Sequence, residues 1–302
     1  MRFFLLIFIL LFLPIKVAKS NTSFSNIGGM SLYDLYLSNP SFIYNDNLVS
    51  FNTYGRAFLY KNNDDPLYLM INSIVSVNNL KSAFLASYYY SQLGTSKAHG
   101  FNIGYSFIHS FNDHLIIRCG VRYDFNNVFI DNSGLIDAQI PGSTYNMYYQ
   151  KNNDLDLGLG IFLYGLTIGL SNNIMLSKKF IYQDDALPDS TSTSGSEYKY
   201  LNILAKYDFK IREKFTITPQ FDYNKIYKSY LSIFLSYLEK YKIGLTYHIA
   251  KGFDSDNKKI MISSSCLIAD KIEIILFFNP GFQKLYDSKT GWNLSGKIGL
   301  KF

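Results

Sequence analysis

Apolar and polar residues alternate along most of this chain. In the stretch 115–126 every odd-numbered residue is apolar, while the even-numbered residues include Arg118, Arg122 and Asp124. A repeat of two residues is that of a β-strand whose two faces meet different surroundings. The stretch therefore predicts a strand of a soluble sandwich or of a membrane barrel, because alternation alone does not separate these two folds.

The last stretch of the sequence, 291–302, has the same pattern and ends on Phe302. Its alternate positions are apolar except for Gly296, and Lys297 and Lys301 lie on the opposite face. About ten residues is the length at which a tilted strand crosses a bilayer. A final strand that ends in Phe is similar to the C-terminal signal of bacterial outer-membrane barrels, and the alternative is the edge strand of a soluble sandwich.

Two-sided stretches of this kind recur from residue 47 onward, and we count about fourteen strands. If the first strand runs outward, the outer connections are mostly long: 59–66, 93–98, 127–153, 177–196, 227–229, 251–258 and 281–290. The inner connections are short: 78–80, 110–113, 163–165, 210–213, 238–240 and 269–270. Outer-membrane barrels have short periplasmic turns and longer external loops, whereas a sandwich has no reason for this asymmetry. The sequence therefore predicts an all-β protein, a transmembrane antiparallel β-barrel of about 14 strands.

The start of the chain predicts export. Residues 1–20 combine a basic start, an apolar run and a small-x-small site, the pattern of a cleaved secretory signal peptide. We expect residues 21–46 to form a short periplasmic or plug segment and residues 47–302 to form the barrel in the outer membrane. Removing the three basic residues of 1–20 lowers the formal net charge from +6 to +3. This surplus is too small to indicate a nucleic-acid partner.

Composition adds little chemistry to this picture. The chain contains 26 Tyr and 25 Phe, which suit strands and membrane boundaries, but only two cysteines, which we expect to be packed thiols. The four histidines lack metal-ligand spacing, and Asp154 and Asp156 share a face without the further carboxylates of a calcium loop. We therefore predict no catalytic residue, no metal and no cofactor.

Charged residues on the polar strand faces are candidates for the lining of the lumen. These residues have two possible roles: they form a polar network that fills or gates the interior, or they line a path for a substrate. The candidates are Arg118, Arg122, Asp124, Lys206, Asp208 and Asp222.

The order of features resembles the PorP/SprF-like membrane proteins of the Bacteroidetes type IX secretion system. The early element LYLSNPSF at 35–42, with Asn39 and Pro40, is similar to the family's Asn-Pro-small-aromatic element. The hairpin LGLGIFLYGLTIGLSN at 157–172 is similar to the family's most recognisable hairpin. The stretches 100–107, 243–247 and 298–302 fit its other strands, whereas the Asn-, Lys- and Tyr-rich loops depart from it.

The resemblance implies an outer-membrane protein without enzymatic activity. Such a protein works with type IX secretion components to secrete a partner, such as an adhesin, or to hold it at the surface, and some members are linked to gliding motility. External loops are the expected contact, with exposed apolar candidates in 127–153, because Tyr and Met are enriched at interfaces. These are Ile140, Tyr145, Met147, Tyr148 and Tyr149. The alternatives are packing of these aromatics at the barrel rim and, for the whole protein, a pore or transporter for small molecules.

Overall fold

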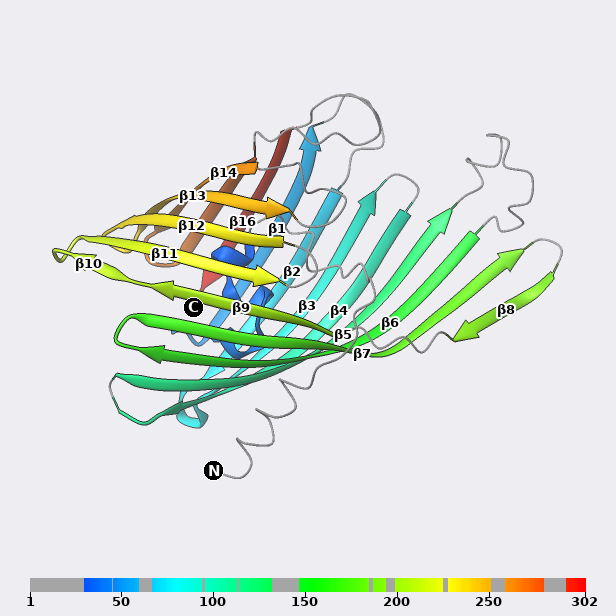
Figure 1. Ribbon diagram of the computed structural model, residues 1–302, viewed down its shortest axis with the longest axis horizontal. Coiled ribbons are helices and arrows are strands. Elements are labelled where there is room, and N and C mark those ends of the chain that lie inside the picture. Colours follow the sequence, from blue (N-terminus) through cyan, green and yellow to red (C-terminus); the bar gives the residue numbers. More distant parts are fainter. Residues whose placement is uncertain are drawn as a thin grey trace.

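The computed structural model describes residues 30–44, 46–59, 67–93, 96–112, 114–131, 147–184, 187–193, 199–224, 228–250, 259–279 and 292–302. Within these ranges the chain forms one antiparallel sheet that closes on itself (Figure 1). The predicted signal peptide, 1–20, lies outside the described residues.

The strands follow one another around the barrel in chain order. The first seven are β1 (Val49–Leu59), β2 (Leu67–Val77), β3 (Ser82–Leu93), β4 (Ser96–Ser110), β5 (Leu115–Asp131), β6 (Met147–Leu163) and β7 (Leu166–Asp184). They are followed by β8 (Leu187–Thr193), β9 (Lys199–Tyr207), β10 (Phe209–Ile211), β11 (Phe215–Asn224) and β12 (Lys228–Tyr237). The last four are β13 (Tyr241–Ala250), β14 (Lys259–Ile268), β15 (Ile272–Asn279) and β16 (Trp292–Lys301).

The closed barrel contains 14 strands, as the sequence predicts. β16 pairs with β1, from Lys301 opposite Ser50 to Trp292 opposite Leu59, and this pairing closes the sheet. β9 and β10 act as one barrel strand, because both pair with β11. Within the described ranges, β8 pairs with β7 alone. The break between β9 and β10 lies opposite Pro219, which has no N–H to donate to the ladder.

The two faces of the barrel strands differ as a membrane barrel requires. On β16, Leu294 and Ile298 are 44% and 58% exposed, and Phe302, which follows the strand, is 63% exposed, whereas Lys297 is 3% exposed. On β2 the burial alternates residue by residue, with apolar Ile71 outside and Asn72 inside. A soluble sandwich would bury the apolar face, so this orientation identifies the outer surface as the one that meets lipid.

The short connections lie at one end of the barrel. The turns at Leu238–Glu239, Ala269–Asp270 and Tyr164–Gly165 each place two neighbouring residues at positive φ. Such turns match the twist of paired strands and fix their register. Among the described residues, no helix is long and apolar enough to cross a membrane.

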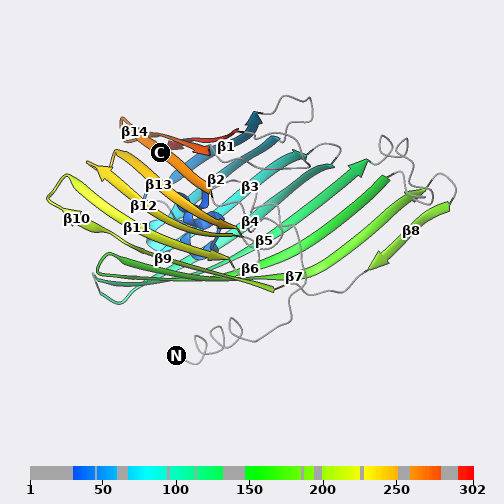
Figure 2. The ribbon, with the colours of Figure 1, turned by 45° about the horizontal axis from the view of Figure 1, so that its top comes forward.

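The strands β5 to β8 include residues that the sequence predicts to be loop. Residues 127–131 and 147–153, expected to be loop, extend β5 and β6, and residues 177–184 extend β7. β7 pairs with β9 only as far as Ile174, and from Lys179 onward it pairs with β8 instead. These strands therefore continue past the barrel at the end opposite the short turns, as Figures 1 and 2 show. We missed them because strands outside the membrane need no alternation of apolar and polar residues.

Candidate functional site

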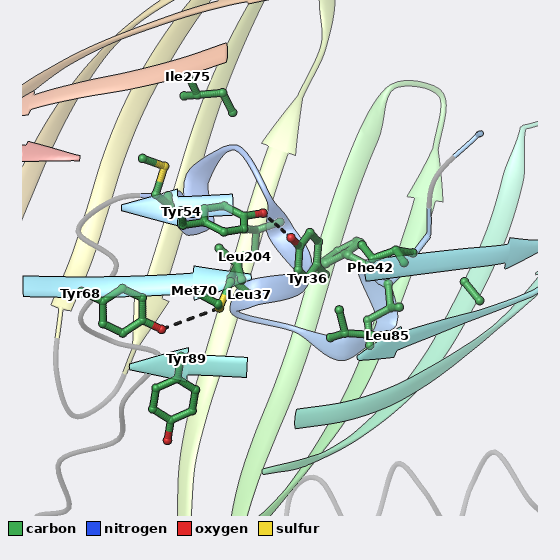
Figure 3. Close-up of a cluster of buried hydrophobic side chains, with 14 of the residues drawn as sticks. Tyr36, Leu37, Phe42, Tyr54, Tyr68, Met70, Leu85, Tyr89, Leu204 and Ile275 are labelled. Carbon is green, nitrogen blue, oxygen red and sulfur yellow. Dashed lines mark hydrogen bonds between the residues drawn. The ribbon is translucent and has the colours of Figure 1, made fainter. Parts of the chain in front are cut away.

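A short segment lies inside the barrel, surrounded by strands (Figures 1 and 2). This inner segment, residues 30–44, consists of three 3-10 turns: η2 (Met30–Leu32), η3 (Leu35–Leu37) and η4 (Pro40–Phe42). Met30, Leu37, Phe42 and Ile43 are buried in one hydrophobic cluster with side chains of several barrel strands. Figure 3 shows part of this cluster. The sequence leaves open whether residues 21–46 form a periplasmic or a plug segment; of these, residues 30–44 contact the lumen wall.

Asn39 ties the turn η4 to two strands. Its side-chain oxygen accepts hydrogen bonds from the Ser41 backbone N–H at 2.9 Å and the Ser41 hydroxyl at 2.8 Å. Pro40 occupies the first position of η4, where a missing N–H costs nothing. The Asn39 amide nitrogen donates to the carbonyls of Leu159 and Leu170 at 3.3 and 3.1 Å, a paired position of β6 and β7. One side chain thus shapes the turn and fixes it to the wall.

Glycines on β5, β6 and β7 make room for this turn. A Cβ added at Gly158 would lie 2.8 Å from the backbone nitrogen of Ser41, and one at Gly160 would lie 2.9 Å from the Ser41 hydroxyl. A Cβ at Gly169 would lie 2.6 Å from the Phe42 ring. These separations are too short for any larger residue, so the glycines form a bed on which the Asn-Pro-Ser-Phe turn rests.

An ion-pair cluster on β5 and β6 holds the middle of the inner segment. Arg122 is 2% exposed and donates to the backbone carbonyls of Tyr36 at 2.8 Å and Leu37 at 3.4 Å. The same guanidinium forms ion pairs with Asp156 and, at 3.4 Å, with Asp124. The carboxylates therefore balance a buried charge whose remaining donors bind the inner segment.

A second cluster, on β15 and β16, holds Asp34 on the other side of the lumen. The Lys297 ammonium lies 2.8 Å from Asp34 and 2.8 Å from Glu273, and it is 3% exposed. The Tyr54 hydroxyl donates to Asp34 at 2.9 Å. Burial raises the pKa of the Asp34 carboxyl above its usual range, and the Lys297 ammonium opposes that shift.

Aromatic side chains complete the contact around the segment. The Tyr36 and Tyr54 hydroxyls are hydrogen-bonded, as the dashed line in Figure 3 shows, and Asn72 donates to Tyr36 at 2.8 Å. The Tyr33 ring packs edge-on against Phe234 and Phe277, with ring centroids 5.1 Å away in each case.

Hydrogen bonds connect the inner segment to further strands. Tyr33 donates to Ser263 at 3.1 Å, Ser171 and Asn202 donate to the Ser38 carbonyl at 2.8 and 3.2 Å, and Ser106 donates to the Ile43 carbonyl. With the bonds above, the inner segment has polar contacts with β1, β2, β4, β5, β6, β7, β9, β14 and β16. It therefore reaches the wall on every side.

The predicted lumen residues fall into separate places. Arg122 and Asp124 lie together at the first cluster, while Asp222 is buried elsewhere on β11. Lys206 and Asp208 form an ion pair at 3.6 Å near the short turns. The Arg118 guanidinium lies over two rings, 4.8 Å from the centroid of Tyr44 and 4.3 Å from that of Phe162.

The structure describes some of the other residues that the sequence analysis names and leaves others outside the described part. Asp156, weighed as a calcium ligand with Asp154, instead accepts from Arg122 and Asn173. Met147, Tyr148 and Tyr149 belong to the extended part of β6, but their side chains lie outside the described part, as do Ile140 and Tyr145 altogether. Cys119 and Cys266 are free thiols.

Sequence reasoning missed the residues that face Asp34. Glu273 and Tyr54 had no motif to mark them, and Lys297 was recognised only as inward-facing. The signal available was a charged residue on the inner face of a strand, which requires a partner. In the part of the chain that the structure describes, no group of three or more His, Cys, Asp or Glu residues could hold a metal ion.

Solved structures share this fold at low sequence identity, and no curated protein matches the sequence. The CymD monoaromatic hydrocarbon channel is 11% identical, with a TM-score of 0.54 over 92% of this chain and 94% of its own. The toluene transporter TodX of Pseudomonas putida is 10% identical, with a TM-score of 0.54 over 91% and 94%. The outer membrane protein Omp33 of Acinetobacter baumannii is 9% identical, with a TM-score of 0.51 over 85% and 98%. These likenesses show the barrel fold alone.

The family comparison is more specific. The family model described as type IX secretion system membrane protein PorP/SprF matches residues 31–288. This span runs from the inner segment through the strands that precede β16, so it includes both the turn at Asn39 and the glycines beneath it. The chain is an outer-membrane β-barrel that belongs to the PorP/SprF family of type IX secretion system membrane proteins.

Proposed function

We propose that this protein is a non-enzymatic component of the type IX secretion system that supports the secretion or surface attachment of a partner protein. An adhesin is the kind of partner we expect, and gliding motility is one process that such an attachment serves. Family membership supports the association with type IX components in the outer membrane.

The observation that carries the proposal is the inner segment. Its contacts reach the wall on every side, and two buried ion-pair clusters fix it, at Arg122 and at Lys297. Breaking a buried ion pair by removing one partner costs about 3–5 kcal/mol, so the segment is an integral part of the folded barrel. A barrel obstructed in this way acts through its surfaces rather than through an open lumen.

The strands that continue past the barrel offer the partner a surface. They comprise the outer parts of β5, β6 and β7, together with β8. In the described residues β8 pairs only with β7, so its other edge carries backbone groups without a strand partner. Tyr148 and Tyr149 lie on the extended part of β6. We assign the partner contact to this four-stranded extension.

Affinity purification from detergent-solubilised outer membranes tests the proposal. We expect the wild-type barrel to retain a secreted surface protein, and the double variant Tyr148→Ala, Tyr149→Ala to retain less of it. Tyr241→Ala is the matched control, because it removes an exposed aromatic ring near the short turns. Retention of the same protein by both variants would assign the contact elsewhere, and purification without any surface protein would contradict the role.

A pore or transporter for small molecules is the second candidate. The observation in its favour is the likeness to structures described as a monoaromatic hydrocarbon channel and a toluene transporter. Conductance in planar bilayers separates the two candidates. The obstructed lumen predicts that the full chain conducts little, and sustained open conductance would favour the pore.

A further inference from the structure

A cavity of about 270 Å3 lies beside the inner segment, at the end of the barrel that carries the short turns. Ser50, Ile74, Phe162 and Lys301 line it, and each lies within a few residues of that end of its strand. Asp34 and Tyr36 of the inner segment form its deep side. The cavity thus faces the periplasm and ends at the obstruction.

The side chains that line the cavity include more cations than carboxylates. Four cationic side chains, Arg118, Lys206, Lys297 and Lys301, face two carboxylates, Asp34 and Glu273. Lys297 is deep and uses both carboxylates, each at 2.8 Å. Lys301 shares Glu273 at 3.5 Å, so the two carboxylates are already engaged by lysines. Lys206 is paired with Asp208 at 3.6 Å. Lys206 and Lys301 are both partly exposed.

Arg118 is the cation left over. No carboxylate of the described residues forms an ion pair with it, although the exposed Asp46 lies close enough to act on its charge. Its Nε is buried without a hydrogen-bond partner. The guanidinium lies over the rings of Tyr44 and Phe162, 4.8 and 4.3 Å from their centroids. A guanidinium that lies over two rings and has an Nε–H without a partner can bind a planar anion through two parallel hydrogen bonds.

We propose that this cavity binds a carboxylate group that enters from the periplasmic side, with Arg118 as its main ligand. The planar fork of Arg118 matches a carboxylate, and the ring of Phe42 together with those of Tyr44 and Phe162 suits an apolar group attached to it. The volume is close to the lower limit of ordinary ligand pockets, so the occupant is one residue or a molecule of that size. A small organic acid and the C-terminal end of a polypeptide both present this chemistry. The inference does not depend on the proposed contact at the outer strands.

Titration calorimetry of the full chain in detergent micelles at low salt tests the site. The probes are 3-phenylpropionate, the tripeptide Gly-Gly-Phe as the free acid, the same tripeptide as the amide, and inorganic phosphate. We expect a free acid to bind and the amide not to bind. Binding of the tripeptide acid indicates a polypeptide end as the occupant, and binding of 3-phenylpropionate alone indicates a small acid.

Variants of the full chain locate the binding. Arg118→Gln should weaken the affinity by about tenfold or more, because it removes a charge-assisted hydrogen bond. Arg118→Lys keeps the charge but loses the planar fork, so its affinity should lie between those of wild type and Arg118→Gln. Lys214→Gln removes a charge from an exposed turn outside the cavity and should leave the affinity unchanged.

Unchanged heat-dependent mobility on denaturing gels shows that each variant is folded. The proposal is overturned if neither acid binds, if acid and amide bind equally, if Arg118→Gln binds as well as wild type, or if inorganic phosphate binds more tightly than either acid.

Discussion

Substitution of Asn39 by Ala is predicted to release the inner segment from the barrel wall without unfolding the barrel. Asn39 accepts two hydrogen bonds from Ser41 and donates two to the carbonyls of Leu159 and Leu170. All four are lost in Asn39→Ala. The strand pairs that form the barrel do not involve the Asn39 side chain, so they remain.

The size of the effect follows from these contacts. Loss of an Asn cap costs about 1 kcal/mol. Two donated hydrogen bonds contribute about 0.5–1.5 kcal/mol each. The free energy that holds the turn against β6 and β7 should therefore fall by about 2–4 kcal/mol, a change of roughly 30- to 800-fold in the docking equilibrium.

Hydrogen exchange measured by mass spectrometry in micelles reports this change. Protection of the amides in 30–44 should fall by about 30-fold or more in Asn39→Ala, while the barrel strands keep theirs. Asn112→Ala is the matched control, because Asn112 also accepts from two backbone N–H groups, those of His114 and Leu115, in an exposed turn. Equal protection of 30–44 in wild type and Asn39→Ala would refute the role given to this side chain.

Three further predictions follow from the same contacts. Gly158→Ala should lower the midpoint of thermal unfolding through a clash with the Ser41 backbone, at a cost of about 1–3 kcal/mol, whereas Gly55→Ala, with its nearest atom at 3.8 Å, should be tolerated. Arg122→Met should destabilise the barrel by about 3–5 kcal/mol in denaturant titrations, and adding Asp156→Asn should recover part of this, since one buried charge is then removed; no recovery would contradict the pairing. Burial raises the pKa of Tyr33 from 10.0 to about 12, so the protonated phenol stabilises docking fully below pH 10 and loses this contribution as the pH rises toward 12; in Tyr33→Phe, exchange of 30–44 should lose this pH dependence, and an unchanged dependence would count against it.

Much of the barrel could be predicted from the sequence because lipid imposes a rule on every strand. The alternation at 115–126 marks β5, and the alternation at 291–302 marks β16, within a residue at most of its ends. The one-sided long connections then separate the barrel from a sandwich. Each of these signals is local, so a single sequence contains it.

The strand ends beyond the membrane could not be predicted for a physical reason. Residues 147–153 and 177–184 extend β6 and β7. Within the first of these, 150–153 reads Gln-Lys-Asn-Asn, which is polar at every position, so no alternation of apolar and polar residues marks a strand there. The pairing of β7 with β8 is visible only after the chain has folded.

The docking of the inner segment could not be predicted from the sequence for another reason. Asn39 and Pro40 indicate a turn, but the partners of that turn are backbone carbonyls more than a hundred residues away, at Leu159 and Leu170. The ion pair between Asp34 and Lys297 joins positions 263 residues apart. The glycines of the hairpin at 157–172 were noticed as part of a resemblance, and their reason became clear only with the turn resting on them.

The central claim is that the protein works by holding a partner at the outer strands of an obstructed barrel. The most direct measurement is site-specific cross-linking in intact cells, with a photoreactive amino acid in place of Lys151, which is exposed on the extended part of β6. Our account predicts that a secreted surface protein is cross-linked from position 151 and not from position 241 near the short turns. Cross-linking of that protein from position 241 alone, or of no protein from position 151, would contradict it.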